Sequence, residues 1–285
     1  MTPFSRKRFG QHFLERAWVD KLIHAIEPAA GQTFLEIGPG RGALTVPLAV
    51  RSRHVVAYEI DRDLATALRA AAPPNLTVLD GDFLEITAER LRHDLTVTGN
   101  PGALRVAGNL PYNVASPILF KLVELHAAGI PLTDATVLLQ REVADRLTAT
   151  PGSRDYGVLT ILIGQSARIT RLFDLPPGAF RPAPKVHSAL VRLAFHRPDA
   201  SAKSPKIFAA LVQAIFTRRR KTLANALKAF PLSTSLPPAV ALDRAALDGQ
   251  RRPETLTIPE LVRLADTFGI QAGSDVLVEA SRAVL

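Results

Sequence analysis

The sequence predicts an α/β protein: a largely parallel sheet with helices on both faces, followed by a small all-helical C-terminal domain. Three observations carry this prediction. From residue 31 to about residue 195, short apolar runs alternate with amphipathic stretches of helical length, which is the pattern of βαβ units. A glycine-rich turn follows the first of these runs. Beyond a stretch at 197–205 that is rich in proline and serine, the pattern is helical only.

The predicted strands are short apolar runs bounded by turn residues. In chain order they are Thr33–Ile37, His54–Tyr58, Leu76–Leu79, Val106–Asn109, Asp134–Gln140, and a pair at Ser166–Leu172 and Ser188–Phe195. Helices are predicted between them, at Ala43–Val50, Asp61–Ala71 and Ser116–Leu125. Pro117 then lies in a first turn, where the missing N–H of proline is tolerated.

The sequence predicts a domain boundary at residue 197. Residues 1–197 would form the sheet domain, including an N-terminal segment at 1–30, and residues 198–285 the helical domain. The helical pattern covers Lys206–Ala229, Pro237–Asp248 and Ile258–Phe268, whereas Gly273–Leu285 fits a helix or a tail equally well.

Composition narrows the class of protein. With 285 residues, 47% of them hydrophobic and 21% charged, the chain has too much apolar material and too little charge for a disordered protein. The longest apolar run, Val158–Ile163, has the length of a strand and is too short to cross a bilayer. Zero cysteines exclude a disulfide scaffold and thiolate metal sites, and fit a reducing, cytoplasmic setting. The net charge of +9 favours a polyanionic partner without identifying one.

The glycine-rich turn predicts a nucleotide-type pocket. The strand Thr33–Ile37 runs into Gly38, Gly40 and Gly42, and a helical pattern follows. Glycines let the backbone approach a ligand closely, and the start of a helix presents free N–H groups. The spacing is G-x-G-x-G, and no Gly-Lys-Ser/Thr follows, so the turn is neither a Walker loop nor the usual dinucleotide fingerprint.

Acidic residues end the next two predicted strands. Glu59 lies 21 residues after Gly38, where a carboxylate can accept hydrogen bonds from both ribose hydroxyls of an adenosine ligand. Asp82 could accept from the adenine amino group, with Phe83 against the ring. Each feature alone is also a common packing or capping device, but three in order at successive strand ends outline a cofactor that contains adenosine.

The sequence Asn-Leu-Pro-Tyr at residues 109–112 follows the fourth predicted strand. The Asn109 side-chain oxygen and the Leu110 carbonyl could each accept one N–H of an adenine amino group, and this would aim the nitrogen lone pair outward for attack on the methyl group of a sulfonium cofactor. Pro111 fixes the loop, and Tyr112 offers a stacking face for a base drawn out of its helix. The alternative is an ordinary proline loop with a satisfied asparagine.

In combination, these motifs resemble the ribosomal RNA adenine dimethyltransferase family, and within it the small-subunit (16S) rRNA branch. The resemblance covers nearly the whole chain. The segments that carry it are Arg8–Leu14, Leu35–Gly42, Glu59–Asp61, Asn109–Pro117, Leu139–Val143, Phe180–Ser188 and Arg219–Leu223.

The resemblance implies a Class I, Rossmann-like methyltransferase fold, S-adenosyl-L-methionine as methyl donor, and dimethylation of two adjacent adenosines near the 3′ end of small-subunit rRNA. It implies that the segment at residues 11–14 closes over the cofactor, with His12 standing where the family usually has Asn. The cofactor-binding residues it implies are His12, Leu14, Gly38, Gly40, Glu59, Ile60, Asp82, Phe83 and Asn109.

The resemblance also implies a second stacking face and an RNA-binding surface. Phe180 would stack on the target base, with a core aromatic as the equal alternative. The basic runs Arg218-Arg219-Arg220-Lys221 and Arg6-Lys7-Arg8 would contact rRNA phosphates, and a solvated helix face is the alternative for the first. No metal is expected, because the histidines lack ligand spacing, and a monomer is expected.

Three other functions stay open on the sequence. A large-subunit rRNA dimethylase of the antibiotic-resistance type shares the cofactor and Asn-x-Pro-aromatic motifs, and the pattern at Arg219–Leu223 favours the small-subunit enzyme instead. A noncatalytic rRNA-binding assembly factor is disfavoured because Gly38, Glu59 and Asn109 are all present. A nicotinamide oxidoreductase is disfavoured by the glycine spacing.

Overall fold

The computed structural model describes residues 12–97, 99, 102–198 and 201–269, and the chain divides into two compact units. The first unit combines the part up to residue 144 with residues 167–196, and the second combines 145–166 with the part from 197 on. The second unit resumes at Arg197, one residue before the start of the predicted helical domain. Residues 145–166, predicted to belong to the sheet domain, pack with the second unit instead, because Tyr156 and Ile161 lie in a hydrophobic cluster with side chains such as Phe208.

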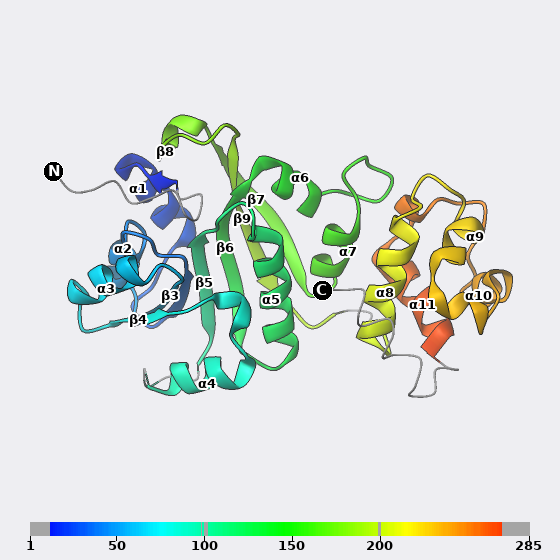
Figure 1. Ribbon diagram of the computed structural model, residues 1–285, viewed down its shortest axis with the longest axis horizontal. Helices are drawn as coiled ribbons and strands as arrows, with labels where there is room; N and C mark the ends of the chain where they lie inside the picture. The colour runs from blue at the N-terminus through cyan, green and yellow to red at the C-terminus, as the bar shows by residue number, and fades with distance from the viewer. Residues whose placement is uncertain (1–11, 98, 100–101, 199–200, 270–285) are drawn as a thin grey trace. The chain divides into compact units, whose positions relative to one another are not determined.

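The first unit is built on a seven-stranded sheet in the order β4-β3-β2-β5-β6-β9-β7, as far as the described residues go (Figure 1). The strands β4, β3, β2, β5 and β6 are mutually parallel, whereas β9 is antiparallel to both of its neighbours. The prediction of a largely parallel sheet is thus confirmed. The bounds are β2 (Thr33–Ile37), β3 (His54–Glu59), β4 (Leu76–Asp80), β5 (Leu104–Asn109), β6 (Leu132–Gln140), β7 (Ala167–Leu175) and β9 (Ser188–Phe195).

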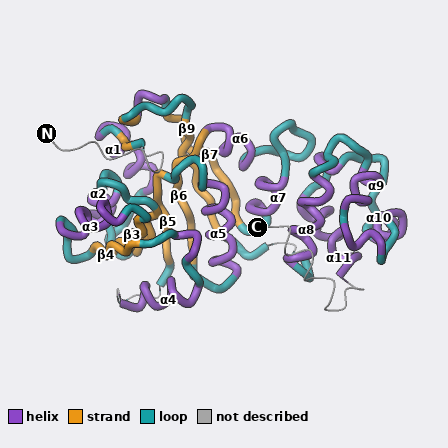
Figure 2. Tube along the Cα trace, in the orientation of Figure 1, coloured by secondary structure: helices purple, strands orange, loops and turns teal. Residues whose placement is uncertain are grey.

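Helices cover both faces of this sheet, as the sequence predicts (Figure 2). They are α1 (Arg16–Ile26), α2 (Thr45–Arg51), α3 (Arg62–Ala70), α4 (Ala88–Val97) and α5 (Ala115–Ala127), with α6 (Arg141–Leu147) and the short 3₁₀ turns η1 (Phe83–Glu85) and η2 (Pro177–Ala179). Buried side chains of α1, α2 and α3 cluster with Phe34, Val55 and Ala57 on one face. Tyr58 points to the opposite face, where its hydroxyl donates to Asp94 of α4 at 2.5 Å.

The carboxyl ends of three neighbouring strands meet at one edge. Ile37 of β2 pairs with Tyr58 of β3, and Glu36 pairs with Ala107 of β5. After β2 the chain proceeds to β3 and β4 on one side of the sheet, and it later returns to β5 on the other side. The crevice at such a reversal of strand order is where open α/β sheets bind ligands.

A second, two-stranded sheet lies beside this edge. Strands β1 (Phe13–Leu14) and β8 (Phe180–Arg181) are antiparallel, with Leu14 opposite Phe180. This pairing joins two segments that are more than 160 residues apart in sequence, and it holds the start of the described chain against the loop that precedes β9.

The second unit is helical in its described part, as predicted. Its elements are α7 (Val158–Gly164), α8 (Pro205–Phe216), α9 (Leu223–Ala226), η3 (Leu227–Ala229), η4 (Pro231–Thr234), α10 (Pro238–Arg244), η5 (Pro253–Thr255) and α11 (Ile258–Gly269). The apolar run at 158–163, which has the length of a strand, forms helix α7 instead. At the start of this helix, the Thr160 hydroxyl accepts a hydrogen bond from the Gly157 N–H at 3.2 Å. No helix in the described part is long and apolar enough to cross a membrane.

The prediction of one continuous helix at Lys206–Ala229 is wrong, because the middle of this range is not helical. Helix α8 ends at Phe216, and α9 begins only at Leu223. The segment between them turns because Arg219 is held away from a helical course: its Nε lies 3.0 Å from Glu254, and its Nη1 donates to the Arg154 carbonyl at 2.8 Å.

Candidate active site

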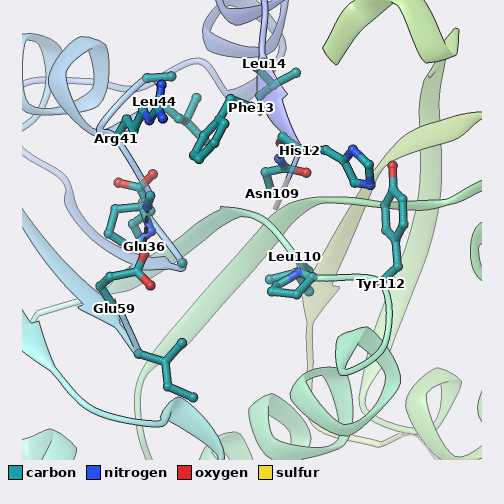
Figure 3. Close-up of a pocket in the computed structure, with 16 residues that line it drawn as sticks. His12, Phe13, Leu14, Glu36, Arg41, Leu44, Glu59, Asn109, Leu110 and Tyr112 are labelled. Atoms are coloured by element: carbon teal, nitrogen blue, oxygen red, sulfur yellow. Dashed lines mark hydrogen bonds between the residues drawn. The ribbon is translucent and has the colours of Figure 1, made fainter. Parts of the chain in front are cut away.

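A pocket opens at the carboxyl edge where β2, β3 and β5 end (Figure 3). Its walls come from the glycine turn, the end of β3, the loop after β5 and the start of the described chain. The lining residues are His12, Phe13, Leu14, Glu36, Gly38, Pro39, Gly40, Arg41, Ala43, Leu44, Glu59, Ile60, Asn109, Leu110, Pro111 and Tyr112. Most residues that the sequence predicts for cofactor and base are thus brought together.

The glycine turn has backbone angles that glycine adopts readily. Gly38 and Gly40 have φ values of +69° and +58°, in the left-handed region. Gly42 has φ +81°, and a Cβ there would lie 2.7 Å from Leu68 Cδ1 of α3. Left-handed backbone at three alternate positions, with close packing against α3 at Gly42, explains why the turn contains glycines.

Glu59 is fixed by the backbone around it. Its Oε2 accepts from the Gly40 N–H at 2.8 Å, and its Oε1 accepts from the Asp61 N–H at 3.0 Å. The residue is 3% exposed and ends strand β3. The carboxylate therefore stands against the glycine turn, where the sequence predicts a partner for ribose hydroxyls.

Glu36 is a second carboxylate of the pocket, and sequence reasoning missed it. It is 1% exposed, and burial, with a smaller contribution from the nearby Glu59 carboxylate, raises its pKa to about 8, although the Thr45 hydroxyl opposes the shift. Glu36 Oε2 and Thr45 Oγ1 are buried and lack a partner at hydrogen-bonding geometry. The signal was available in the sequence: an acidic residue interrupts the apolar strand Thr33–Ile37 just before the glycines.

Asn109 ends strand β5, and its orientation is set by the N-terminal segment. Its Nδ2 donates to the His12 carbonyl at 2.8 Å. A carbonyl can only accept, so the amide nitrogen must face His12, and Oδ1 is turned away from it. The Asn109 side-chain oxygen, which the sequence predicts to accept from an adenine amino group, therefore points in one fixed direction. The backbone of Leu110 is held in turn by a bond from its N–H to the Leu138 carbonyl at 3.2 Å.

His12 joins the N-terminal segment to two parts of the site. Its ring stacks on Tyr112, with centroids 5.7 Å apart and planes at 27° (Figure 3). Its Nδ1 lies 2.7 Å from the Pro182 carbonyl, so Nδ1 carries the proton of this bond. Leu14 lines the pocket, and the Arg41 guanidinium lies 4.5 Å from the centre of the Phe13 ring. His12 and Leu14 thus both line the pocket.

The structure does not bring Asp82 or Phe83 into the pocket. The Asp82 carboxylate accepts from the Leu84 N–H at 2.9 Å and caps the turn η1. That turn directs Phe83 inward, where it is 4% exposed and packs edge-on against Tyr58 with ring centroids 5.8 Å apart. Neither residue is among those that line the pocket, and Ile60, which is 44% exposed, is the apolar side chain at the end of β3 that does.

Phe180 lies in the core. It is completely buried, at 0% exposed, in the cluster that contains the apolar face of α1. Its position opposite Leu14 in the two-stranded sheet explains this burial. The structure thus agrees with the core alternative that the sequence left open, and the expected stacking face for the target base is not available at this residue.

The predicted RNA-binding residues have different environments. Arg218, Arg220 and Lys221 are exposed in the turn after α8, whereas Arg219 is partly buried and paired with Glu254. Arg6, Lys7 and Arg8 lie outside the described residues. No group of three or more potential metal ligands occurs in the described part of the chain.

Comparison with known proteins places this site in a family. The sequence profile described as ribosomal RNA adenine dimethylase matches residues 4–258. A relative named ribosomal RNA small subunit methyltransferase A, from Xanthomonas euvesicatoria pv. vesicatoria (strain 85-10), is 42% identical over 266 residues, which is 92% of this chain and 95% of the relative.

Solved structures show the same fold. The crystal structure of a dimethyladenosine transferase from Plasmodium falciparum matches with a TM-score of 0.72 at 24% identity, over 91% of this chain and 98% of the other. The crystal structure of the 23S rRNA methyltransferase ErmE matches with a TM-score of 0.62 at 26% identity, over 90% of this chain and 99% of the other. The predicted Rossmann-like methyltransferase fold is confirmed, and the chain belongs to the ribosomal RNA adenine dimethylase family.

Proposed function

We propose that this protein transfers methyl groups from S-adenosyl-L-methionine to N6 of two adjacent adenosines near the 3′ end of small-subunit (16S) rRNA. The observation that carries the proposal is the Asn109 amide, whose nitrogen is bound to the His12 carbonyl and whose oxygen is directed away from it, in a pocket that also holds Glu59. An acceptor fixed in this way suits an amino group.

The residues of the pocket fit S-adenosyl-L-methionine. Glu59 offers a carboxylate for the ribose hydroxyls, Ile60 an apolar contact for the adenine, and Gly38 and Gly40 a close approach of the backbone. The buried Glu36 oxygen without a partner suits a donor or a positive charge of the ligand. The cofactor supplies a methyl group that is bonded to a positively charged sulfur. The sulfur is the leaving group when the methyl group is transferred.

The chain's own groups then prepare the nucleophile. Asn109 Oδ1 and the Leu110 carbonyl can each accept one N–H of the adenine amino group, which restrains the nitrogen and directs its lone pair outward. Tyr112 offers the flat surface on which an extruded base stacks. No strong general base is required, because the methylated nitrogen is acidic enough to lose its proton to water.

Sequence identity favours the small subunit over the large subunit as the substrate. Identity to the small subunit methyltransferase A of X. euvesicatoria is 42%, against 26% to the 23S rRNA methyltransferase ErmE. A noncatalytic assembly factor is disfavoured because Glu59 and Asn109 both face one pocket. We further propose that the protein acts as a monomer on ribosomal particles in the cytoplasm.

Replacement of the acceptor tests the proposal. Asn109→Ala should lower kcat for methyl transfer by about 100-fold or more, by analogy with loss of one preorganised transition-state contact, while the Kd for S-adenosyl-L-methionine changes little. The matched control is Asn75→Ala, which removes an amide bonded to the Ala49 carbonyl at 2.7 Å, outside the pocket. Wild-type turnover in Asn109→Ala would refute the assigned role.

A further inference from the structure

Ser188 is a buried hydroxyl residue beside the site. It begins strand β9, where it pairs with Gln140 of β6 on one side and with Leu175 of β7 on the other. It is 0% exposed. Strands on both sides hold its backbone, so its Cα and Cβ have a fixed place in the sheet.

The partner of this hydroxyl is Tyr112. The two oxygens, Tyr112 Oη and Ser188 Oγ, lie 2.6 Å apart across 76 residues of sequence. Tyr112 sits on the loop after β5, whereas Ser188 is on β9, and β6 lies between these strands in the sheet. The bond therefore fastens the far end of a loop side chain to the interior of the sheet.

The Tyr112 ring is held at several points. Its backbone follows Pro111, whose φ is fixed by its ring, and its hydroxyl is bound by Ser188. His12 covers one face of the ring. Anchoring the hydroxyl fixes where the ring lies, because the Cβ–Oη axis is then held at both ends, and the His12 ring packed on one face opposes rotation about that axis.

The fixed position of the ring has a direct consequence for the chemistry. A base that stacks on Tyr112 takes its orientation from the ring, and the position of its amino group relative to Asn109 Oδ1 follows from that orientation. Small misplacements of a reacting group reduce rates strongly. The contact with Ser188 thus influences the acceptor geometry although Ser188 does not line the pocket.

We infer that Ser188 is a positioning residue for methyl transfer, which holds the Tyr112 ring in place through its hydroxyl. The inference rests on the proposed function of the pocket. Ser188 acts through Tyr112 and touches neither substrate nor cofactor.

Kinetics of three variants test the inference. Ser188→Ala and Tyr112→Phe remove the same hydrogen bond, so each should lower kcat by roughly 3- to 10-fold, the fold-change for a net hydrogen bond of about 1 kcal/mol. The KM for S-adenosyl-L-methionine should not change. The double variant should be no slower than the slower single variant, because the bond can be lost only once.

The matched control is Ser52→Ala. It also removes a buried hydroxyl, which donates to the Leu48 carbonyl at 2.8 Å, but away from the pocket. It should lower the thermal midpoint like Ser188→Ala and leave kcat at the wild-type value. Equal kcat values for Ser188→Ala and Ser52→Ala would reduce Ser188 to a structural residue and overturn the inference.

A spectroscopic readout separates this inference from the proposed function. The chain has 3 tyrosines, so labelling with [¹³Cζ]tyrosine gives a simple spectrum in which Tyr112→Phe identifies the Tyr112 resonance. Ser188→Ala should shift that resonance and leave those of Tyr58 and Tyr156 in place. An unmoved Tyr112 resonance would overturn the inference. If the wild-type protein transfers no methyl group, the proposed function fails, while the resonance still decides the Ser188 contact.

Discussion

Burial raises the pKa of Glu36 to about 8, so its carboxyl group is largely protonated at neutral pH. Between its ordinary pKa of about 4.5 and pH 8, the folded state holds a proton that the unfolded chain has released. The contribution of Glu36 to the stability of the fold is complete below its ordinary pKa and is lost as the pH rises through its pKa in the folded state. The free energy of unfolding therefore falls with rising pH in this window, by at most about 1.4 kcal/mol per pH unit from this group.

Glu36→Gln should remove this pH dependence. Gln keeps the shape and neutrality of the protonated acid, so the variant should become increasingly more stable than the wild type between pH 5 and pH 9. Urea unfolding at several pH values measures the difference, with the exposed Glu85→Gln as control. Parallel stability curves for Glu36→Gln and wild type would contradict the assigned protonation.

Gly108 tests how closely the strands must approach beneath the site. A Cβ at this position would lie 2.8 Å from the Ile37 carbonyl oxygen, so Gly108→Ala must shift β5 against β2. We expect a loss of about 1–3 kcal/mol in unfolding free energy together with lower methyl transfer, because Asn109 is the next residue. Gly31→Ala has no atom within 4 Å of the added carbon and should be tolerated. Equal stability of the two variants would contradict this account.

Single residues of the site differ in how well the sequence predicts them. Gly38, Glu59 and Asn109 were predictable because their chemistry follows from a turn or a strand end. The Asp82 carboxylate binds the N–H of Leu84, a local contact that the spacing of the motif does not reveal. Ser188 could not be found at all, since its contact depends on the antiparallel pairing of β9 with β6.

At the scale of elements, the buried Arg105 anchors helix α1 to the sheet. Its guanidinium binds Asp134 of β6 through Nε and Nη2, both at 2.8 Å, and donates to the carbonyls of Ile26 and Glu27 at the end of α1. Both side chains of the ion pair are 11% exposed. The network fixes the helix that follows the site's N-terminal segment.

Arg105→Ala should therefore be costly. It leaves Asp134 buried with only the more distant Arg192, whose Nε is 3.7 Å away. Breaking a buried ion pair from one side costs about 3–5 kcal/mol, and denaturant unfolding measures it. The control Arg69→Ala removes an exposed ion pair with Asp80 and should cost about 1 kcal/mol or less. Similar losses in the two variants would contradict the anchoring role.

Helices and strands were predictable where residues such as glycine mark both of their ends in the sequence. Strand β2 agrees with its prediction at both ends because Gly31 precedes it and Gly38 follows it. The break between α8 and α9 was not predictable, because the ion pair of Arg219 with Glu254 joins positions 35 residues apart. Strands β1 and β8 are 2 residues each and carry no periodic signal.

At the scale of the whole molecule, the net charge of +9 favours an RNA partner, and the turn after α8 is the basic surface that can be tested first. Replacing the exposed Arg218, Arg220 and Lys221 together with Ala should weaken binding to small-subunit rRNA. The salt dependence, the slope of log K against log[salt], should fall by about 2–3 if each cation contacts one phosphate. Arg219 is left intact, because its pairing with Glu254 supports the fold of the second unit.

A triple replacement elsewhere controls for charge alone. Arg51, Arg69 and Arg92 are exposed or half-exposed residues of the first unit, and their change to Ala removes the same charge. This variant should keep the wild-type salt slope. Equal slopes for both triple variants and wild type would remove the turn after α8 from the RNA interface.

Methyl transfer to small-subunit rRNA can be measured on ribosomal particles. Purified protein is incubated with labelled S-adenosyl-L-methionine and either immature small ribosomal subunits or large subunits, and the labelled nucleosides are identified. We expect N6,N6-dimethyladenosine from small subunits alone, and its loss in Asn109→Ala. Label in large-subunit rRNA, or no transfer to either particle despite cofactor binding, would contradict it.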